Sequence, residues 1–119
     1  MNAPNLGIIE SRFADIIWAN VPISSPELVK IAEKELNWKK STTYTVLKRL
    51  CEKGIFKNEK AQVTAVLTKK EYFSKQSEKF VDDAFDGSLP EFLAAFTAQK
   101  KLNDSEIDYL QKLIDQHKK

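Results

Sequence analysis

The stretch from Trp38 to Gly54, WKKSTTYTVLKRLCEKG, constrains the fold more than any other part of the chain. At a period of 3.6 residues its side chains separate into two faces, which predicts a helix packed on one side against a core. Ser41 occupies the expected N-cap position, and Gly54 lies where the helix is expected to stop. The inward face holds Thr43, Val46, Leu47, Leu50 and Cys51.

The outward face of this predicted helix carries hydroxyl groups in its first two turns and cations after them. Short hydroxyl side chains can contact base edges or phosphates, and Lys and Arg neutralise phosphates. The pattern indicates a helix that reads DNA, although an ordinary solvent-exposed amphipathic helix would show the same separation of side chains into two faces. The DNA-contact candidates on this helix and at its start are Lys39, Lys40, Ser41, Thr42, Thr45, Lys48 and Arg49.

The preceding residues predict two further short helices. Residues 8–18 repeat apolar side chains at helical spacing, and Asn20-Val21-Pro22 ends that segment. Ile23 is suited to a short extended segment, and Ser24-Ser25-Pro26-Glu27 is a helix start with a hydroxyl cap and a proline in the first turn. With a tight turn at Asn37-Trp38, the second and third helices form a helix-turn-helix pattern.

Two short runs with β propensity follow Gly54 and enclose the polar stretch KNEKAQ. In the second run, VTAVLT, an apolar residue recurs at every second position, which is typical of a strand. The runs predict a β-hairpin, or wing, whose polar tip holds Lys57, Asn58 and Lys60, and Lys60 is a further DNA-contact candidate. We therefore expect residues 1–68 to form a winged-helix DNA-binding domain.

Residues 69–119 predict a helical dimerisation domain. Thr68-Lys69-Lys70-Glu71, Ser88-Leu89-Pro90-Glu91 and Asn103-Asp104-Ser105-Glu106 are helix starts, and Gly87 breaks the first helix. Three short helices cannot hide all the apolar side chains of this arm, and exposing them is costly at roughly 25 cal/mol per Å². A symmetric dimer would bury them; the alternative is an arm that folds back on the winged domain. The dimerisation candidates are Phe73, Phe80, Phe85, Leu89, Phe92, Leu93, Phe96, Ile107, Leu110, Leu113 and Ile114.

The fold class expected from these patterns is mainly α with a small β-hairpin. Positive charge concentrates around the predicted DNA-reading helix, because residues 38–60 hold seven Lys and Arg against two Asp and Glu. Residues 69–119 hold nine against ten. This charge distribution is typical of a surface that binds nucleic acid; the alternative interpretation is a basic face that only contacts solvent.

The sequence contains no arrangement typical of catalysis or of a bound cofactor or metal. Its single histidine, His117, lies in the last helical turn, and its single cysteine, Cys51, is expected to be a buried thiol. The three glycines are isolated, so no phosphate-cradling loop is predicted. No apolar run approaches 18 residues, and the N-terminus lacks the pattern of a signal segment. We therefore expect a cytoplasmic protein that is not an enzyme and does not insert into a membrane.

The run Trp38-x-x-x-Thr42-x-x-Thr45-x-Leu47-x-Arg49-Leu50-x-x-Lys53-Gly54 resembles the recognition-helix region of the penicillinase repressor family, the BlaI/MecI-type transcriptional repressors. The segment 10–18 is similar to the first helix of that family. The segments 80–87 and 102–107 are similar to its C-terminal half. The resemblance covers about residues 6–117, nearly the whole chain.

This resemblance implies a homodimeric winged-helix repressor that binds a palindromic double-stranded operator with TACA and TGTA half-sites. It implies DNA contacts by Thr42 and Thr45, with Arg49 directed towards phosphate and Ser41 at a neighbouring, variable contact position. The family is often paired with a membrane sensor metalloprotease whose signalling leads to cleavage of the repressor. The bond that matches the cleavage position is Ala95-Phe96.

The chain departs from the family pattern at two places. In the wing, Ala61-Gln62-Val63-Thr64-Ala65 stands where the family usually has a Gly-Arg pair and alternating aromatic residues. At the cleavage position Phe96 is kept, whereas Ala95 stands in place of asparagine.

The alternative to a DNA-binding repressor is a winged-helix dimer that binds DNA weakly and acts as a protein-interaction regulatory module.

Overall fold

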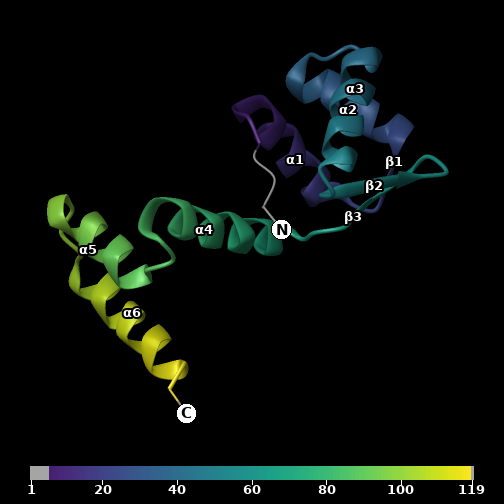
Figure 1. Cartoon of the computed structure of the whole chain (residues 1–119). Coiled ribbons are helices and arrows are strands. Elements are labelled where there is room, and N and C mark those ends of the chain that lie inside the picture. Colours follow the sequence, from purple (N-terminus) through teal and green to yellow (C-terminus); the bar gives the residue numbers. More distant parts are fainter. Residues whose placement is uncertain (1–5, 119) are drawn as a thin grey trace. The chain divides into compact units, whose positions relative to one another are not determined.

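The computed structural model of the protein describes residues 6–118, and the chain divides into two compact units, Met1–Lys79 and Phe80–Lys119. The described residues form six helices and a three-stranded sheet, so the predicted fold class is confirmed (Figure 1). The elements are α1 Ile8–Asn20, β1 Ile23–Ser24, α2 Ser25–Leu36, α3 Lys40–Glu52, β2 Phe56–Glu59, β3 Gln62–Ala65, α4 Lys69–Phe85, α5 Leu89–Gln99 and α6 Asp104–Gln116.

The helix-turn-helix of the first unit consists of α2 and α3. As predicted, Ser24 caps α2, because its hydroxyl oxygen accepts a hydrogen bond from the Glu27 N–H at 3.3 Å. The helix ends at Leu36, and the left-handed backbone of the next residue, Asn37 (φ 56°, ψ 37°), turns the chain towards α3. Asparagine tolerates this conformation better than most residues, and it is common directly after a helix.

The prediction that Ser41 caps α3 is wrong. The cap residue is Lys39, whose extended backbone (φ −72°, ψ 158°) precedes the first helical residue, Lys40. The Lys39 carbonyl accepts the hydrogen bond from the Thr43 N–H at 3.1 Å, so the helix begins before the first hydroxyl side chain. Ser41 therefore lies inside the first turn, on the exposed side of α3.

The sheet is antiparallel with the strand order β1-β3-β2, and the short segment predicted at Ile23 is its first strand. The wing prediction is confirmed as a hairpin but wrong about its tip, because β2 and β3 continue into the polar stretch (Figure 1). The turn consists of Lys60 and Ala61 alone, with φ values of 51° and 60°. Two positive φ values give the backbone twist that two-residue hairpins require. Lys57 and Asn58 therefore belong to β2.

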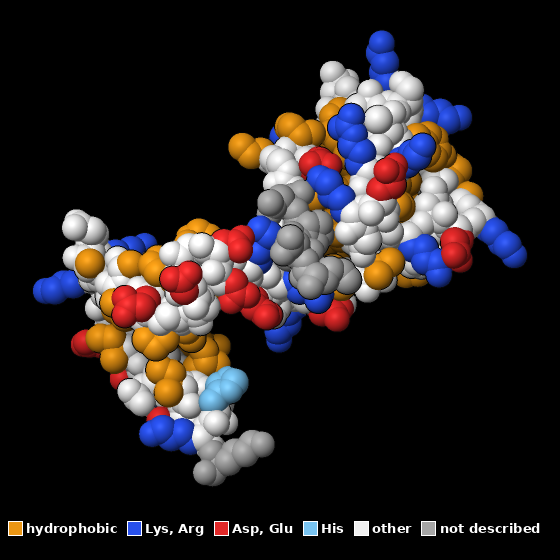
Figure 2. Space-filling model, viewed as in Figure 1, with side chains coloured by type: hydrophobic (Ala, Val, Ile, Leu, Met, Phe, Trp, Pro, Cys, Tyr) orange, Lys and Arg blue, Asp and Glu red, His pale blue; other side chains and the backbone are white. Residues whose placement is uncertain are grey.

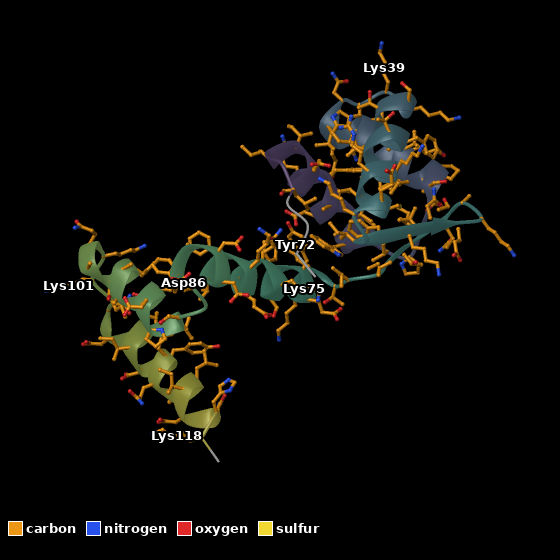
Figure 3. All side chains as sticks on the ribbon, viewed as in Figure 1. Lys39, Tyr72, Lys75, Asp86, Lys101 and Lys118 are labelled. Atoms are coloured by element: carbon orange, nitrogen blue, oxygen red, sulfur yellow. The ribbon has the colours of Figure 1, made fainter. Side chains whose placement is uncertain are left out.

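The core of the first unit lies between its helices and the sheet. Trp18 packs against Phe56 and Tyr72, with ring centroids 5.2 and 5.6 Å away. The Trp18 Nε1–H also donates to the Leu67 carbonyl oxygen at 2.9 Å. These contacts attach the beginning of α4, where Tyr72 lies, to the winged domain (Figure 3). The fully buried side chains of this core include Phe13, Ile17, Leu28, Leu50, Ile55, Phe56 and Val63.

The three helix starts predicted for the arm are present at α4, α5 and α6. Thr68 and Glu71 exchange two hydrogen bonds of 3.0 Å, Ser88 caps α5, and Asn103 caps α6 through a capping box. In the second unit, rings of α4 and α5 pack with centroids about 6 Å apart. None of the residues of α5 or α6 is buried, which leaves an apolar surface on this unit.

Candidate nucleic-acid interface

The eight DNA-contact candidates lie on the surface of the first unit. Seven belong to α3 or its cap and one to the wing turn, and every one of them is exposed. Lys39, at the start of α3, projects away from the unit (Figure 3). In the space-filling view, Lys and Arg side chains gather over α3 and at the tip of the hairpin (Figure 2). The candidates are Lys39, Lys40, Ser41, Thr42, Thr45, Lys48, Arg49 and Lys60.

The two faces of α3 are distinguished most clearly by two threonines. Thr43 is fully buried, and its hydroxyl donates to the Lys39 carbonyl oxygen at 3.2 Å. Thr45 is exposed, and its hydroxyl donates to the Ser41 carbonyl oxygen at 2.9 Å. Because this bond uses the hydroxyl proton, Thr45 presents an oxygen acceptor and a methyl group outward. Such a side chain can accept from a base amino group or contact a thymine methyl.

The beginning of α3 favours negatively charged groups. The side chain of Lys39, the cap residue, makes no hydrogen bond to the first backbone N–H groups of the helix. N–H groups at a helix N-terminus and the helix dipole both attract anions such as phosphate. The ammonium groups of Lys39 and Lys40 add positive charge at the same end.

The inward face and the C-terminal end of α3 hold the helix in place. Val46, Leu47 and Leu50 are buried in the core. After the last turn, Lys53 Nζ lies 3.0 and 3.1 Å from the two carboxylate oxygens of Glu10 on α1. The hydrogen bond from Lys53 is the main cause that lowers the pKa of Glu10. These contacts fix the position of α3 on the first unit, and they leave its outward face exposed.

The wing contributes a single exposed cation at its turn, Lys60. On the neighbouring strand, Lys57 Nζ lies 3.2 Å from Glu59 Oε1, and both side chains are more than half exposed. This pair offsets the charge of Lys57, so Lys60 is the wing residue best suited to a phosphate.

A crevice of about 370 Å³ separates α3 from β2. The prediction of a buried Cys51 is only partly right, because this side chain is half-buried on the wall of the crevice. Burial raises the pKa of its thiol. On the same wall, Tyr44 donates its hydroxyl proton to Ser25 Oγ at 3.3 Å. Tyr44 was not among the predicted site residues, because it lies between the two faces of the helical wheel and belongs clearly to neither.

The dimerisation candidates are half-buried or exposed, and all but Phe73 lie in the second unit. Figure 2 shows apolar side chains gathered along α5 and α6. Between these helices lies a groove of about 480 Å³. Its lining is mainly apolar: Phe92, Leu93, Phe96, Leu102, Asn103, Ser105, Glu106, Tyr109 and Leu110.

The fold and the exposed face of α3 together define a winged helix-turn-helix protein with a helical arm. A family model described as penicillinase repressor matches residues 6–116, and the chain belongs to this family. The penicillinase repressor of Bacillus licheniformis is 26% identical over 119 residues, covering 97% of this chain and 93% of the relative. The methicillin resistance regulatory protein MecI of Staphylococcus aureus is 22% identical over 110 residues, covering 89% of each.

A third relative carries no functional name. It is an uncharacterised 16.5 kDa protein of Latilactobacillus sakei, 26% identical over 103 residues that cover 83% of this chain and 70% of the relative. The family membership supports a transcriptional repressor, and the two relatives with functional names are described as a repressor and a regulatory protein rather than as enzymes. Within residues 6–118, no helix has the length and apolar character needed to cross a bilayer.

Proposed function

We propose that the protein binds a palindromic DNA operator as a homodimer and represses transcription from it. The observation that carries this proposal is the exposed face of α3, where hydroxyl groups and cations project from a helix whose other face is buried. In helix-turn-helix proteins the second helix enters the major groove and its exposed side chains reach base edges. The family membership supports the same assignment.

Within this interface, Thr45 and Arg49 have different roles. Thr45 lies in the middle of the outward face and reads a base edge, whereas Arg49, one turn further on, contacts a phosphate. The remaining cations of α3 and Lys60 neutralise backbone charge. A lost base contact costs about 1–3 kcal/mol and relaxes specificity at one position, while a lost phosphate contact weakens binding to every sequence alike.

The apolar surface of α5 and α6 supports assembly with a second copy of the chain. Leu89, Phe96, Ile107, Leu113 and Ile114 are each between 43% and 56% exposed, which is unfavourable for such side chains in water. A two-fold dimer would bury this surface on both copies and place two α3 helices for the two half-sites of a palindrome.

Relief of repression by a protease-linked signal is the remaining part of the proposal. The bond between Ala95 and Phe96 lies inside α5, Leu89–Gln99, and both residues are exposed in the single chain. A regular helix must open locally before a protease can hold its backbone in an extended form. We therefore expect cleavage to require unwinding of α5. Mass spectrometry of the protein from derepressed cells should show new termini at this bond, whereas an intact chain would indicate another mechanism of relief.

The proposal of DNA binding is tested with the full chain and two duplexes, one with TACA and TGTA half-sites and one of random sequence. The variant Thr45→Ala should narrow the affinity gap between the duplexes. The variant Arg49→Ala should weaken binding to both duplexes, and it should make the negative slope of log affinity against log salt shallower by about one. Arg12→Ala removes an exposed arginine of α1 and should change neither value.

The same binding measurements also separate the proposed repressor from a protein-interaction module. If the wild-type protein binds both duplexes weakly and with little dependence on salt, the regulatory module becomes the better assignment. If Thr45→Ala leaves the ratio of the two affinities unchanged, α3 does not read sequence through this residue. Circular dichroism of each variant checks that the fold is retained.

A further inference from the structure

Ser25, the first residue of α2, joins two parts of the candidate interface that are distant in sequence. Its backbone N–H donates to the Ala61 carbonyl oxygen in the wing turn at 2.8 Å. Its hydroxyl oxygen accepts the hydrogen bond from Tyr44 on α3 at 3.3 Å. Only 4% of Ser25 is exposed, so water competes little for either bond. One buried residue therefore contacts both the wing turn and the predicted recognition helix.

The backbone of the wing turn has an unfavourable conformation, which a hydrogen bond from Ser25 helps to stabilise. Lys60 and Ala61 both have positive φ values, a conformation that residues with a Cβ atom adopt at an energetic cost. The bond from the Ser25 N–H adds one hydrogen bond beyond the paired residues of β1 and β3, directly at this turn. It fixes the backbone next to Lys60, the cation of the wing that is suited to a phosphate.

Tyr44 bonds to the side chain of Ser25, whereas the wing turn bonds to its backbone N–H. Tyr44 directly precedes Thr45 on α3, and its half-buried ring lines the crevice between α3 and β2 together with Lys48 and Asn58. Its hydroxyl group reaches across to α2 and ends on Ser25 Oγ. Tyr44 thus links the helix that carries the outward contacts to the residue that holds the wing turn.

We propose that Tyr44 is a positioning residue for DNA binding. Through Ser25 it keeps the wing turn, and with it Lys60, at a set position relative to the outward face of α3. The phosphates of a duplex have a fixed spacing, so cations on two elements bind them well together only when those elements are held in matching positions beforehand. This inference rests on the proposed function, because it explains how two parts of the same interface act together.

The test uses Tyr44→Phe in the full chain, which removes only the hydroxyl group. Affinity for the duplex with TACA and TGTA half-sites should fall by about three- to tenfold, the loss expected for one hydrogen bond. The negative slope of log affinity against log salt should become shallower, towards that of Lys60→Ala, which is expected to be shallower than wild type by about one. The matched control is Tyr72→Phe, which removes a hydroxyl group that accepts from Gln76 on α4.

A double variant distinguishes positioning of the wing from a general effect on α3. In a Lys60→Ala background, Tyr44→Phe should change the affinity by less than about twofold, because the contact it positions is already absent. An equal loss in both backgrounds with an unchanged salt slope would overturn the inference and leave the proposed function intact. A Tyr44→Phe variant that binds the duplex with wild-type affinity would also overturn the inference.

Hydrogen exchange in the free protein tests the link without DNA. Tyr44→Phe should speed exchange of the Ser25 amide several-fold, while amides buried in the core of α1 keep their protection. An unchanged Ser25 amide would overturn the inference, whatever the protein binds. If exchange speeds up but the wild-type protein binds neither duplex, the proposed function fails and Tyr44 keeps only its link to the wing turn.

Discussion

Lys53 Nζ lies 3.0 Å from Glu10 Oε1 and joins the end of α3 to the first turn of α1. The two residues are 43 positions apart, and each lies in a different segment of the family resemblance. Their side chains are only 33% and 18% exposed, so this pair is less screened by water than a fully exposed one. The contact ties the position of the predicted recognition helix to the core of the winged domain.

The Glu10–Lys53 pair makes stability depend on pH. Because the pKa of Glu10 is lowered in the folded state, its contribution is complete above the ordinary carboxyl pKa of 4.5 and is lost as the pH falls through the lowered value. Glu10→Gln should reduce the free energy of unfolding by about 1 kcal/mol at pH 7, and the difference from wild type should shrink below pH 4.5.

Urea unfolding at several pH values measures this difference. Glu59→Gln is the matched control, because it removes the exposed partner of Lys57 and should leave stability nearly unchanged. A deficit of Glu10→Gln that persists unchanged at pH 3 would show that the charge of Glu10 is not the cause.

Trp18→Phe tests the attachment of α4 to the winged domain. The substitution keeps an aromatic ring near Phe56 and Tyr72 but removes the N–H that donates to the Leu67 carbonyl oxygen. We expect a loss of about 1–2 kcal/mol in the free energy of unfolding, because a part-buried carbonyl group loses its partner. Val66→Ala, at an exposed neighbouring position, should change stability by less than about 0.5 kcal/mol. Equal losses in the two variants would contradict this role of the Trp18 hydrogen bond.

Ile114→Asp tests assembly through the arm. Ile114 on α6 is 49% exposed, and a carboxylate there would have to lose its hydration in an apolar interface. We expect the dimer dissociation constant to rise at least about tenfold in sedimentation of the full chain, which corresponds to 1.4 kcal/mol. The control Ile8→Asp changes an exposed isoleucine of α1 and should leave the dissociation constant unchanged. A wild-type chain that sediments as a monomer at micromolar concentration would contradict the proposed dimer.

Cys51 should react slowly with thiol reagents in the folded protein. Burial raises the pKa of its thiol, so a smaller fraction is present at pH 8 as the reactive thiolate. Reaction in buffer is therefore expected to be several-fold slower than reaction in denaturing urea, where the same thiol is solvated. A rate that does not increase on unfolding would contradict the burial of Cys51 beside the crevice.

Local sequence patterns were enough to predict the order and type of the elements and the exposed face of α3. Helix periodicity and capping act over three or four residues, so they are legible locally, as at Ser24, Thr68 and Asn103. The outward positions of α3 were predicted correctly as exposed for the same reason. The family resemblance was also carried by a local run of residues, and the family model confirms it.

Local sequence patterns gave the wrong cap residue for α3 and the wrong tip for the wing, because backbone conformation and strand pairing set both positions. At the start of α3, the extended backbone of Lys39 makes it the cap, although a serine two residues later has the better capping side chain. In the wing, pairing between β2 and β3 extends through polar residues to a turn at Lys60 and Ala61, neither of which is a glycine. Strand pairing and tertiary hydrogen bonds outweighed the local preferences of these residues.

Contacts between residues far apart in the sequence come from the packing of the folded unit. Trp18 and Leu67 are 49 positions apart, and Tyr44 and Ser25 are 19 apart, yet each pair shares a hydrogen bond. Such contacts depend on how helices and strands pack around one core, and the periodicity of one segment carries no information on its partner across the core. The physical reason is that local structure is selected by neighbouring residues, whereas the geometry that joins α3 to the wing is selected by packing of the whole unit.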